Sequence, residues 1–233
     1  VAGYGRQTGS HGGSGYPMLR LVAVVACGTR TIIDAVVGPY RVSELGLTPR
    51  LLNCLRPGML LLADRNFAVR DLLGRFTATG AHVLIRCKEG RHLPPIGRCP
   101  DGSWLAVLGG VRIRVIDANI AVTLGSTGRR HIGRYRLITT LTDHRAFPAH
   151  DLVTVYHQRW EIETAFLELK ATLLRGRVLR ARTPAGVEQE IYALLCGYQA
   201  VRQAMADTTT HTRINPDRAS FTVAVNIARD QII

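Results

Sequence analysis

The first half of the chain alternates between strand-like and helix-like hydrophobic spacing. Two runs rich in β-branched residues, 19–26 and 31–37, are joined by a short turn containing Gly28, which predicts an antiparallel hairpin. Leucines within 47–55 recur at helical spacing, so a helix is expected there. The wholly apolar run 59–63 predicts a short strand buried on both faces. After it we expect a helix over 67–79 and a strand over 82–86.

The second half of the chain begins with a β pattern and ends with a helical one. Two apolar runs, 104–108 and 111–116, are separated by Gly109-Gly110, which predicts a hairpin with a two-residue turn. The other expected elements are strands at 120–124 and 134–140 and helices over 152–174 and 184–207. The last helix has an apolar stripe formed by Val187, Ile191, Leu194, Tyr198, Val201 and Met205.

The order of these elements predicts an α/β domain that carries an all-β insertion. The N-terminal segment is rich in glycine and lacks acidic residues, which is typical of a flexible linker. The expected division is a flexible lead-in at 1–16, the first part of the core at 17–86, a β-rich insertion at 87–149, core helices at 150–207 and a C-terminal tail at 208–233.

The composition is strongly basic, with 30 Lys and Arg against 17 Asp and Glu and a net charge of +13. Arginine supplies nearly all of the positive charge, since Lys88 and Lys170 are the only lysines. Because the planar guanidinium group suits phosphate recognition, a nucleic acid is the expected partner. A coding preference for arginine would raise the charge without such a function, and that alternative stays open.

The cysteines and the apolar runs limit the class of protein further. Five scattered cysteines include no Cys-x-x-Cys pair, which argues against both a disulfide framework and a zinc site. Free thiols favour a reducing, cytoplasmic setting. The longest apolar run, at 18–27, is much shorter than the roughly 18 residues expected of a membrane span. We therefore expect a globular protein without a membrane partner.

Four polar residues recur along the helix expected over 152–174. At about 100° per residue, Tyr156, Arg159, Glu163 and Lys170 fall within about 60° of one another and form one ridge. Arg159 and Glu163 would equally make an ordinary i,i+4 ion pair on a solvated helix. A core stripe runs beside the ridge and consists of Ile162, Phe166, Leu169 and Leu173.

Asp64 ends the apolar run 59–63 and is a second candidate for chemistry. Open α/β sheets place ligand-binding groups at the carboxyl ends of their strands. The alternative is a cap of the following helix, a role that Asn66 would fill equally well.

The strand expected at 111–116 alternates between apolar residues and arginines. Alternation places Arg112 and Arg114 on one face of the sheet, opposite the apolar side chains. We expect this arginine face to contact the DNA backbone. An ordinary solvent-facing side of a half-buried strand is the alternative.

The spacing Tyr156-x2-Arg159-x3-Glu163-x6-Lys170 resembles the signature of one branch of DDE transposases, typified by insertion sequence four. The segment that ends in Asp64 is similar to that family's second-aspartate strand. The resemblance continues through 16–20, 178–180 and 218–221, and so covers nearly the whole chain. The four-residue signature is specific, whereas the flanking segments are supportive only.

The resemblance implies a ribonuclease H-like catalytic core in which three carboxylates hold two divalent metal ions, Mg²⁺ or Mn²⁺. Asp64 and Glu163 would be two of the three catalytic and metal-binding carboxylates, and Tyr156, Arg159 and Lys170 would grip DNA phosphates. The implied activity is DNA strand cleavage and strand transfer at transposon ends. The implied partners are the transposon ends, the target DNA and further copies of the protein, at the bacterial nucleoid, without a small-molecule substrate.

The sequence departs from the family pattern at the first aspartate. No Asp or Glu precedes Asp34, which falls on the expected third strand of the fold. We therefore expect an N-terminally truncated chain that is inactive by itself. One alternative is a catalytically dead remnant that keeps basic DNA affinity. The other is an unrelated basic protein that binds RNA or the ribosome.

Overall fold

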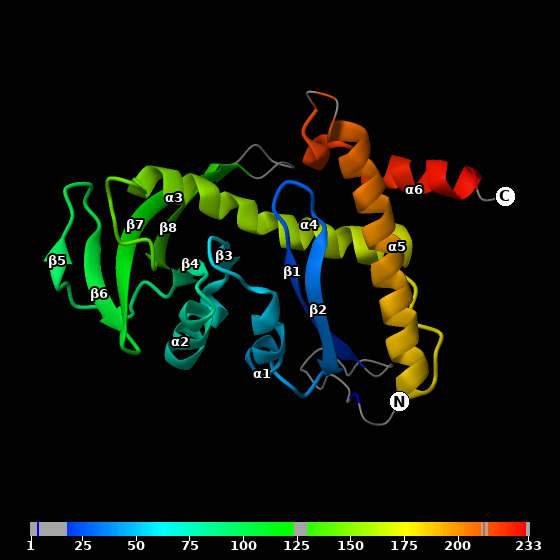
Figure 1. Ribbon diagram of the computed structural model, residues 1–233, viewed down its shortest axis with the longest axis horizontal. Coiled ribbons are helices and arrows are strands. Elements are labelled where there is room, and N and C mark those ends of the chain that lie inside the picture. The colour runs from blue at the N-terminus through cyan, green and yellow to red at the C-terminus, as the bar shows by residue number, and fades with distance from the viewer. Residues whose placement is uncertain (1–3, 5–17, 124–129, 211, 213, 232–233) are drawn as a thin grey trace. The chain divides into compact units, whose positions relative to one another are not determined.

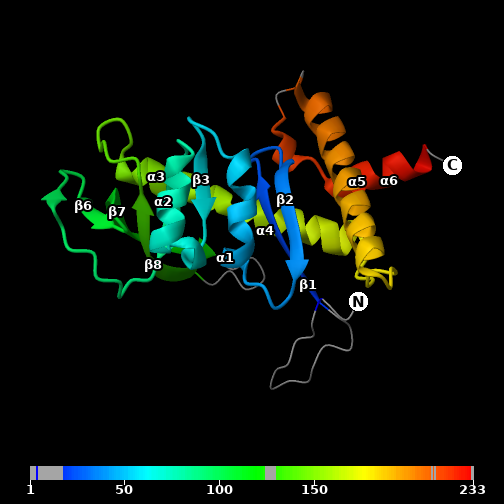
Figure 2. The same ribbon diagram turned by 60° about the horizontal axis from the view of Figure 1, so that its bottom comes forward.

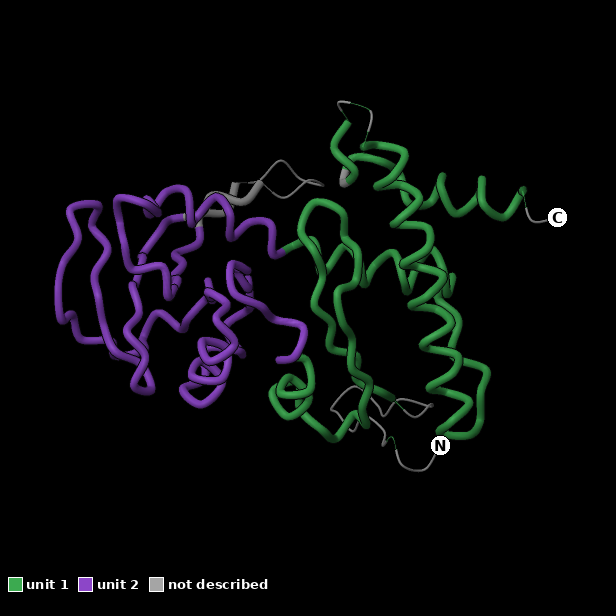
Figure 3. Tube along the Cα trace, viewed as in Figure 1, with its two compact units in different colours: residues 1–51, 160–233 green, residues 52–159 purple. Residues whose placement is uncertain are grey.

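The structure, a computed structural model, describes residues 4, 18–123, 130–210, 212 and 214–231. They form two compact units (Figure 3). The hairpin–helix unit comprises Val1–Leu51 and Trp160–Ile233, and the sheet unit comprises Leu52–Arg159. Except for Tyr4, the lead-in expected at 1–16 lies outside the described residues.

The hairpin–helix unit begins with the expected antiparallel hairpin of β1 (Leu19–Val25) and β2 (Ile32–Pro39). Gly28 (φ 86°) and Arg30 (φ 56°) both have left-handed backbone in the turn. Ser43 then caps the short helix α1 (Glu44–Leu47) by accepting from the Gly46 N–H at 3.1 Å.

The helix expected within 47–55 continues as the 3₁₀ segment η1 (Thr48–Cys54) rather than as an α-helix. Pro49 has no N–H to donate, which interrupts the α hydrogen-bonding pattern at that point. Leu47 and Leu51 are both buried and pack with Val36 of the hairpin. The apolar spacing therefore located the packing residues but not the helix type.

The helical elements of this unit are α4 (Glu161–Leu167), the π-helical segment η4 (Glu168–Leu173), α5 (Pro184–Thr210), the 3₁₀ turn η5 (Pro216–Arg218) and α6 (Phe221–Asp230). Of these, α4 contacts β1 and α5 contacts β2 of the hairpin, whereas α6 packs against α5 and η4 (Figure 1). The segment 208–233, expected as a tail, includes α6, whose Phe221 and Val225 are buried in the common core. On α5 the buried positions are Val187, Ile191, Leu195, Tyr198, Arg202 and Met205.

The sheet unit has one six-stranded mixed sheet with the order β3-β4-β8-β7-β6-β5. Its strands are β3 (Leu60–Ala63), β4 (His82–Cys87), β5 (Gly97–Arg98), β6 (Trp104–Leu108), β7 (Val111–Thr123) and β8 (Arg130–Thr139). β3 and β4 are parallel, and the other pairs are antiparallel. The strands expected at 111–116 and 120–124 are one continuous strand, β7.

The β-rich block expected at 87–149 continues the sheet begun by β3 and β4 instead of forming a sheet of its own. β8 connects the two parts, because Leu84 and Ile85 of β4 lie opposite Thr139 and Ile138 of β8. Among the described strands β3 lies at the sheet edge, so its leucines are only partly buried. The run 59–63 is therefore less buried than the sequence predicted.

Helices connect and cover the strands of the sheet unit. The turn η2 (Arg65–Phe67) and helix α2 (Arg70–Ala78) join β3 to β4, and α2 packs against β4 (Figure 2). Helix α3 (Ala149–Tyr156) buries Leu152 and Tyr156 against β4 and β8, and the 3₁₀ turn η3 (His157–Trp160) follows it. In the described parts of both units, no helix is long and apolar enough to cross a membrane.

Candidate functional site

Asp64 lies directly after β3, at the carboxyl end of the parallel strand pair. Its Oδ1 accepts a hydrogen bond from the Arg65 N–H at 2.7 Å, so Asp64 caps η2. Asp64 therefore caps the η2 turn and also stands at a strand end, so both roles considered for it from the sequence are compatible. A half-exposed carboxylate at a strand end is therefore available to a ligand while one of its oxygens shapes the turn.

Tyr156 is buried beneath the end of β3 and is only 4% exposed. Its hydroxyl donates to the carbonyl oxygen of Ala63, the residue before Asp64, at 3.1 Å. Burial raises the pKa of Tyr156 to about 12. The Tyr156 hydroxyl therefore holds the backbone that presents Asp64 and is not free to meet a phosphate.

Two arginines lie near this strand end. The charges of Arg159 and Arg86 act to lower the pKa of Tyr156, whereas that of Asp64 acts to raise it. The Arg159 guanidinium is 5.9 Å from the Tyr156 ring centroid, and that of Arg86 is 3.9 Å from the Tyr135 ring centroid. Sequence reasoning missed Arg86, although its place at the end of a strand that follows the Asp64 strand was an available signal.

Glu163 and Lys170 belong to the hairpin–helix unit and are both exposed. Glu163 lies on α4, and Lys170 lies in η4 with its Nζ 5.9 Å from the Phe166 ring centroid. The helix expected over 152–174 consists of α, 3₁₀, α and π segments in turn. Because 3₁₀ and π turns differ from 3.6 residues per turn, a uniform 100° per residue does not describe the ridge.

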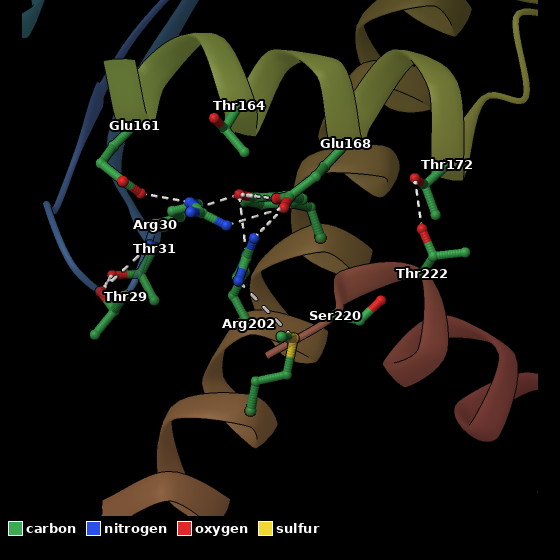
Figure 4. Close-up of polar contacts among 12 residues, drawn as sticks. Thr29, Arg30, Thr31, Glu161, Thr164, Glu168, Thr172, Arg202, Ser220 and Thr222 are labelled. Atoms are coloured by element: carbon green, nitrogen blue, oxygen red, sulfur yellow. Dashed lines mark hydrogen bonds and ion pairs between the residues drawn. The ribbon is translucent and has the colours of Figure 1, made fainter. Parts of the chain in front are cut away.

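A buried ionic network holds η4 against α5 within the hairpin–helix unit (Figure 4). Glu168 is 9% exposed and accepts from Arg202, which is fully buried, and from the Tyr198 hydroxyl at 3.1 Å. Arg30 of the hairpin turn binds Glu161 and, at 3.4 Å, Glu168. We call these five residues the Glu168 network.

The Glu168 network fixes the helical segment that carries Lys170. Glu168 is two residues before Lys170 and begins η4. Burial raises the pKa of Tyr198 to about 12, so it stays a neutral hydrogen-bond donor. Sequence reasoning missed the network, although Arg202 follows Tyr198 at helical spacing on the apolar face of α5 and so marked a charged position in the core.

The DNA contact expected of Arg114 is corrected by the structure. Alternation along β7 is as predicted, because Ile113 and Val115 are buried and Arg112 is exposed. Arg114, however, is 0% exposed and donates to Ser103 Oγ at 2.7 Å, to the Phe147 carbonyl at 2.6 Å and to Asp101. The segments that contain these partners cover this face of the strand, so Arg114 cannot reach a phosphate.

Across residues 18–123 and the later described ranges, no three or more His, Cys, Asp or Glu side chains gather as a metal site. Asp64 and Glu163 offer the hard carboxylate oxygens that Mg²⁺ and Mn²⁺ favour. Each of these two carboxylates, taken by itself, therefore has donor chemistry that suits such an ion.

The hydroxyl of Tyr156 gives a test that separates positioning from DNA contact. Tyr156→Phe should lower the free energy of unfolding by about 1 kcal/mol, because the Ala63 carbonyl loses its buried donor. DNA affinity without metal, and its salt dependence, should stay unchanged. Urea denaturation measures the free energy of unfolding, and fluorescence anisotropy measures DNA affinity. Tyr192→Phe, at an exposed position, is the control. A fall of about 1 in the slope of log affinity against log salt concentration would instead show that Tyr156 contacts a phosphate.

The chain matches the family model described as "Transposase DDE domain" over residues 2–199. It is 27% identical over 230 residues to "Transposase InsG for insertion sequence element IS4" of Escherichia coli (strain K12), covering 94% of this chain and 52% of that protein. It is 38% identical over 58 residues to "Putative transposase InsZ" of the same strain, covering 25% of this chain and 19% of that protein. The chain thus spans about half the length of InsG.

A solved structure shares the fold. The chain resembles one in the "Cryo-EM structure of piggyBac transposase synaptic complex with hairpin DNA" with a TM-score of 0.55 and 11% identity, over 97% of this chain and 50% of that one. At this identity the likeness concerns the fold. It confirms the α/β class expected from the sequence and supports its ribonuclease H-like assignment, and the family match confirms the resemblance that the signature indicated.

Proposed function

This chain belongs to the transposase DDE domain family, and we propose that it supplies two catalytic carboxylates, Asp64 and Glu163, for DNA strand cleavage and strand transfer at transposon ends. The observation that carries the proposal is the hydrogen bond from Tyr156 to Ala63. It joins the first residue of the four-residue signature to the strand end that presents Asp64. Two motifs separated by more than ninety residues thus meet in one place in the sheet unit.

The proposed role of both carboxylates is to hold Mg²⁺ or Mn²⁺. When bound, such ions activate a water or a 3′-hydroxyl and stabilise the leaving oxygen of an in-line displacement. Asp64 is positioned for this by the η2 turn and by Tyr156, whereas Glu163 lies exposed on α4. The η2 turn and Tyr156 thus fix the direction of the Asp64 carboxylate before an ion binds.

The proposed DNA contacts use arginine and lysine side chains that the structure leaves at least partly exposed. Arg159, Lys170 and Arg112 are such residues, and we add Arg86 because it lies near Tyr156 and the end of β3. Phosphate contacts position a protein on DNA without reading its sequence. The proposed setting is the bacterial nucleoid, where transposon ends and target DNA would be bound by associated copies of the protein.

The third carboxylate is not assigned to any residue of this chain. No Asp or Glu precedes Asp34, and Asp34 lies on β2, where its Oδ1 accepts from the Ala35 N–H at 2.8 Å. We therefore expect the 233-residue chain to bind DNA without nicking it in Mg²⁺. The proposal favours a working catalytic domain over a dead remnant because both carboxylates and the complete signature are present.

Nicking of plasmid DNA that carries the element's terminal repeats tests this proposal. The 233-residue chain is compared with a polypeptide extended upstream in the same reading frame, each with Mg²⁺ and with EDTA. We expect Mg²⁺-dependent nicking from the extended polypeptide alone, and its loss in both Asp64→Asn and Glu163→Gln. Arg75→Ala, an exposed change on α2, should leave nicking intact.

Two outcomes would contradict parts of the proposal. Nicking that survives both carboxylate substitutions would remove Asp64 and Glu163 from the chemistry. Nicking by the 233-residue chain alone, abolished by Glu163→Gln, would show that the third carboxylate lies within the chain.

A further inference from the structure

A pocket rich in arginine lies in the hairpin–helix unit, where the chain passes from η4 to α5. It is open to solvent, has a volume of about 400 Å³, and is lined by Arg175, Arg177, Val178, Arg180, Glu190 and Arg229, among others. We call it the arginine pocket. Its arginines come from the connection after η4 and from α6, so segments distant in sequence converge on it.

The backbone after η4 turns sharply to form one side of the pocket. Arg175 (φ 52°) and Gly176 (φ 69°) both have left-handed backbone, and the Gly176 N–H donates to the Lys170 carbonyl at 3.0 Å. This bond closes the end of the helical segment that carries Lys170. The pocket therefore begins within one turn of a proposed DNA-contact residue in the same unit.

The carboxylate of Glu190 binds backbone N–H groups rather than a guanidinium group of the pocket. Its two oxygens accept from the backbone N–H groups of Arg180, at 2.9 and 3.0 Å, and of Ala181, at 2.9 Å. In the described chain no carboxylate lies within ion-pair distance of the guanidinium groups of Arg175, Arg177, Arg180 or Arg229. Glu190 thus shapes the wall, and four cationic groups share the pocket with one carboxylate.

We propose that the arginine pocket binds a phosphate group of a DNA strand, beyond the residues of the four-residue signature. Guanidinium groups bind phosphate oxygens through paired hydrogen bonds, and the negative charge relieves the repulsion between neighbouring arginines. The apolar side chain of Val178 offers a surface for the adjoining sugar. The inference rests on the proposed function, because it extends the DNA contact from Lys170 along the same unit.

DNA binding as a function of salt tests the pocket. The double substitution Arg177→Ala with Arg180→Ala should weaken duplex binding at least about tenfold. It should also lower the slope of log affinity against log salt by about 2, because two phosphate contacts are lost. The matched control, Arg41→Ala with Arg75→Ala, removes the same charge from exposed sites outside the pocket and should change both quantities much less.

Further measurements separate a loss of DNA binding from a loss of folding, and DNA phosphate from free phosphate. Arg177→Lys with Arg180→Lys keeps the charge and should restore part of the affinity, and thermal unfolding should match the wild type because both side chains are exposed. Inorganic phosphate should compete for DNA on the wild-type chain more strongly than chloride of equal ionic strength.

The outcomes separate the failure of this inference from that of the proposed function. A wild-type chain that does not bind DNA would overturn both. Wild-type binding with an unchanged double-alanine variant would overturn the pocket alone. If that variant lost calorimetric binding of inorganic phosphate yet bound DNA normally, the pocket would be a free-phosphate site.

Discussion

Replacing Glu168 by alanine should cost about 3–5 kcal/mol in the free energy of unfolding, because it leaves the Arg202 guanidinium buried without its carboxylate. Arg202 is 0% exposed, and Glu168 is its ion-pair partner in the described structure. The Tyr198 hydroxyl would lose an acceptor in the same step. Urea denaturation followed by far-UV circular dichroism measures the change.

Two variants control this prediction. Glu163→Ala lies on the same helical stretch but is exposed, so its effect on stability should be about 0.5 kcal/mol or less. Glu168→Leu combined with Arg202→Met replaces the ion pair by apolar side chains and should recover most of the loss. A Glu168→Ala variant as stable as Glu163→Ala would show that water or another residue compensates Arg202.

Replacing Arg114 by alanine should destabilise the sheet unit by about 2–4 kcal/mol, because buried hydrogen-bond acceptors lose their donor. The change removes the buried donor to Ser103 and to the Phe147 carbonyl and unpairs Asp101. Arg112→Ala, on the same face of β7 but exposed, should change stability by about 0.5 kcal/mol or less. Thermal unfolding of the two variants gives the comparison, and equal melting temperatures would contradict it.

Acid should reduce this difference. Burial acts to raise the pKa of Asp101, but hydrogen bonds from Ser103 and Ala149 and the charge of Arg114 outweigh it and hold that pKa below its usual value. A lowered pKa in the folded state stabilises the fold above the unfolded pKa of about 4, and the contribution is lost as the pH falls through the folded pKa. The wild type should therefore lose more stability than Arg114→Ala below about pH 4.

Local patterns in the sequence predicted the elements that depend on neighbouring residues. The hairpin of β6 and β7 follows from Gly109 and Gly110, whose positive φ values of 58° and 79° suit a two-residue turn. The pairing of β8 with β4 joins residues 49 to 55 positions apart, and no periodicity contains that information. From the sequence, the strand that precedes Asp64 and the later β strands therefore looked like members of separate sheets.

The same limit explains why the contacts of Arg114 and Tyr156 differ from those expected of them. Alternation correctly put Arg112 and Arg114 on one face, but only the fold shows that Asp101, Ser103 and Phe147 cover one of them. Tyr156 was assigned to DNA by resemblance, whereas its hydroxyl meets a carbonyl 93 positions away. Charge and spacing identify chemistry-bearing residues, and tertiary contacts decide which of them face outward.

The hairpin–helix unit is discontinuous, because the segment 52–159 separates its hairpin from its helices. On the ribosome, β1 and β2 emerge well before α5, so their apolar side stays without its partner while the sheet unit is synthesised. The sheet unit is a single contiguous segment and has the shorter loops to close. Folding should therefore proceed from the middle of the chain outward. The ion pair between Arg30 and Glu168 should be among the last contacts to form.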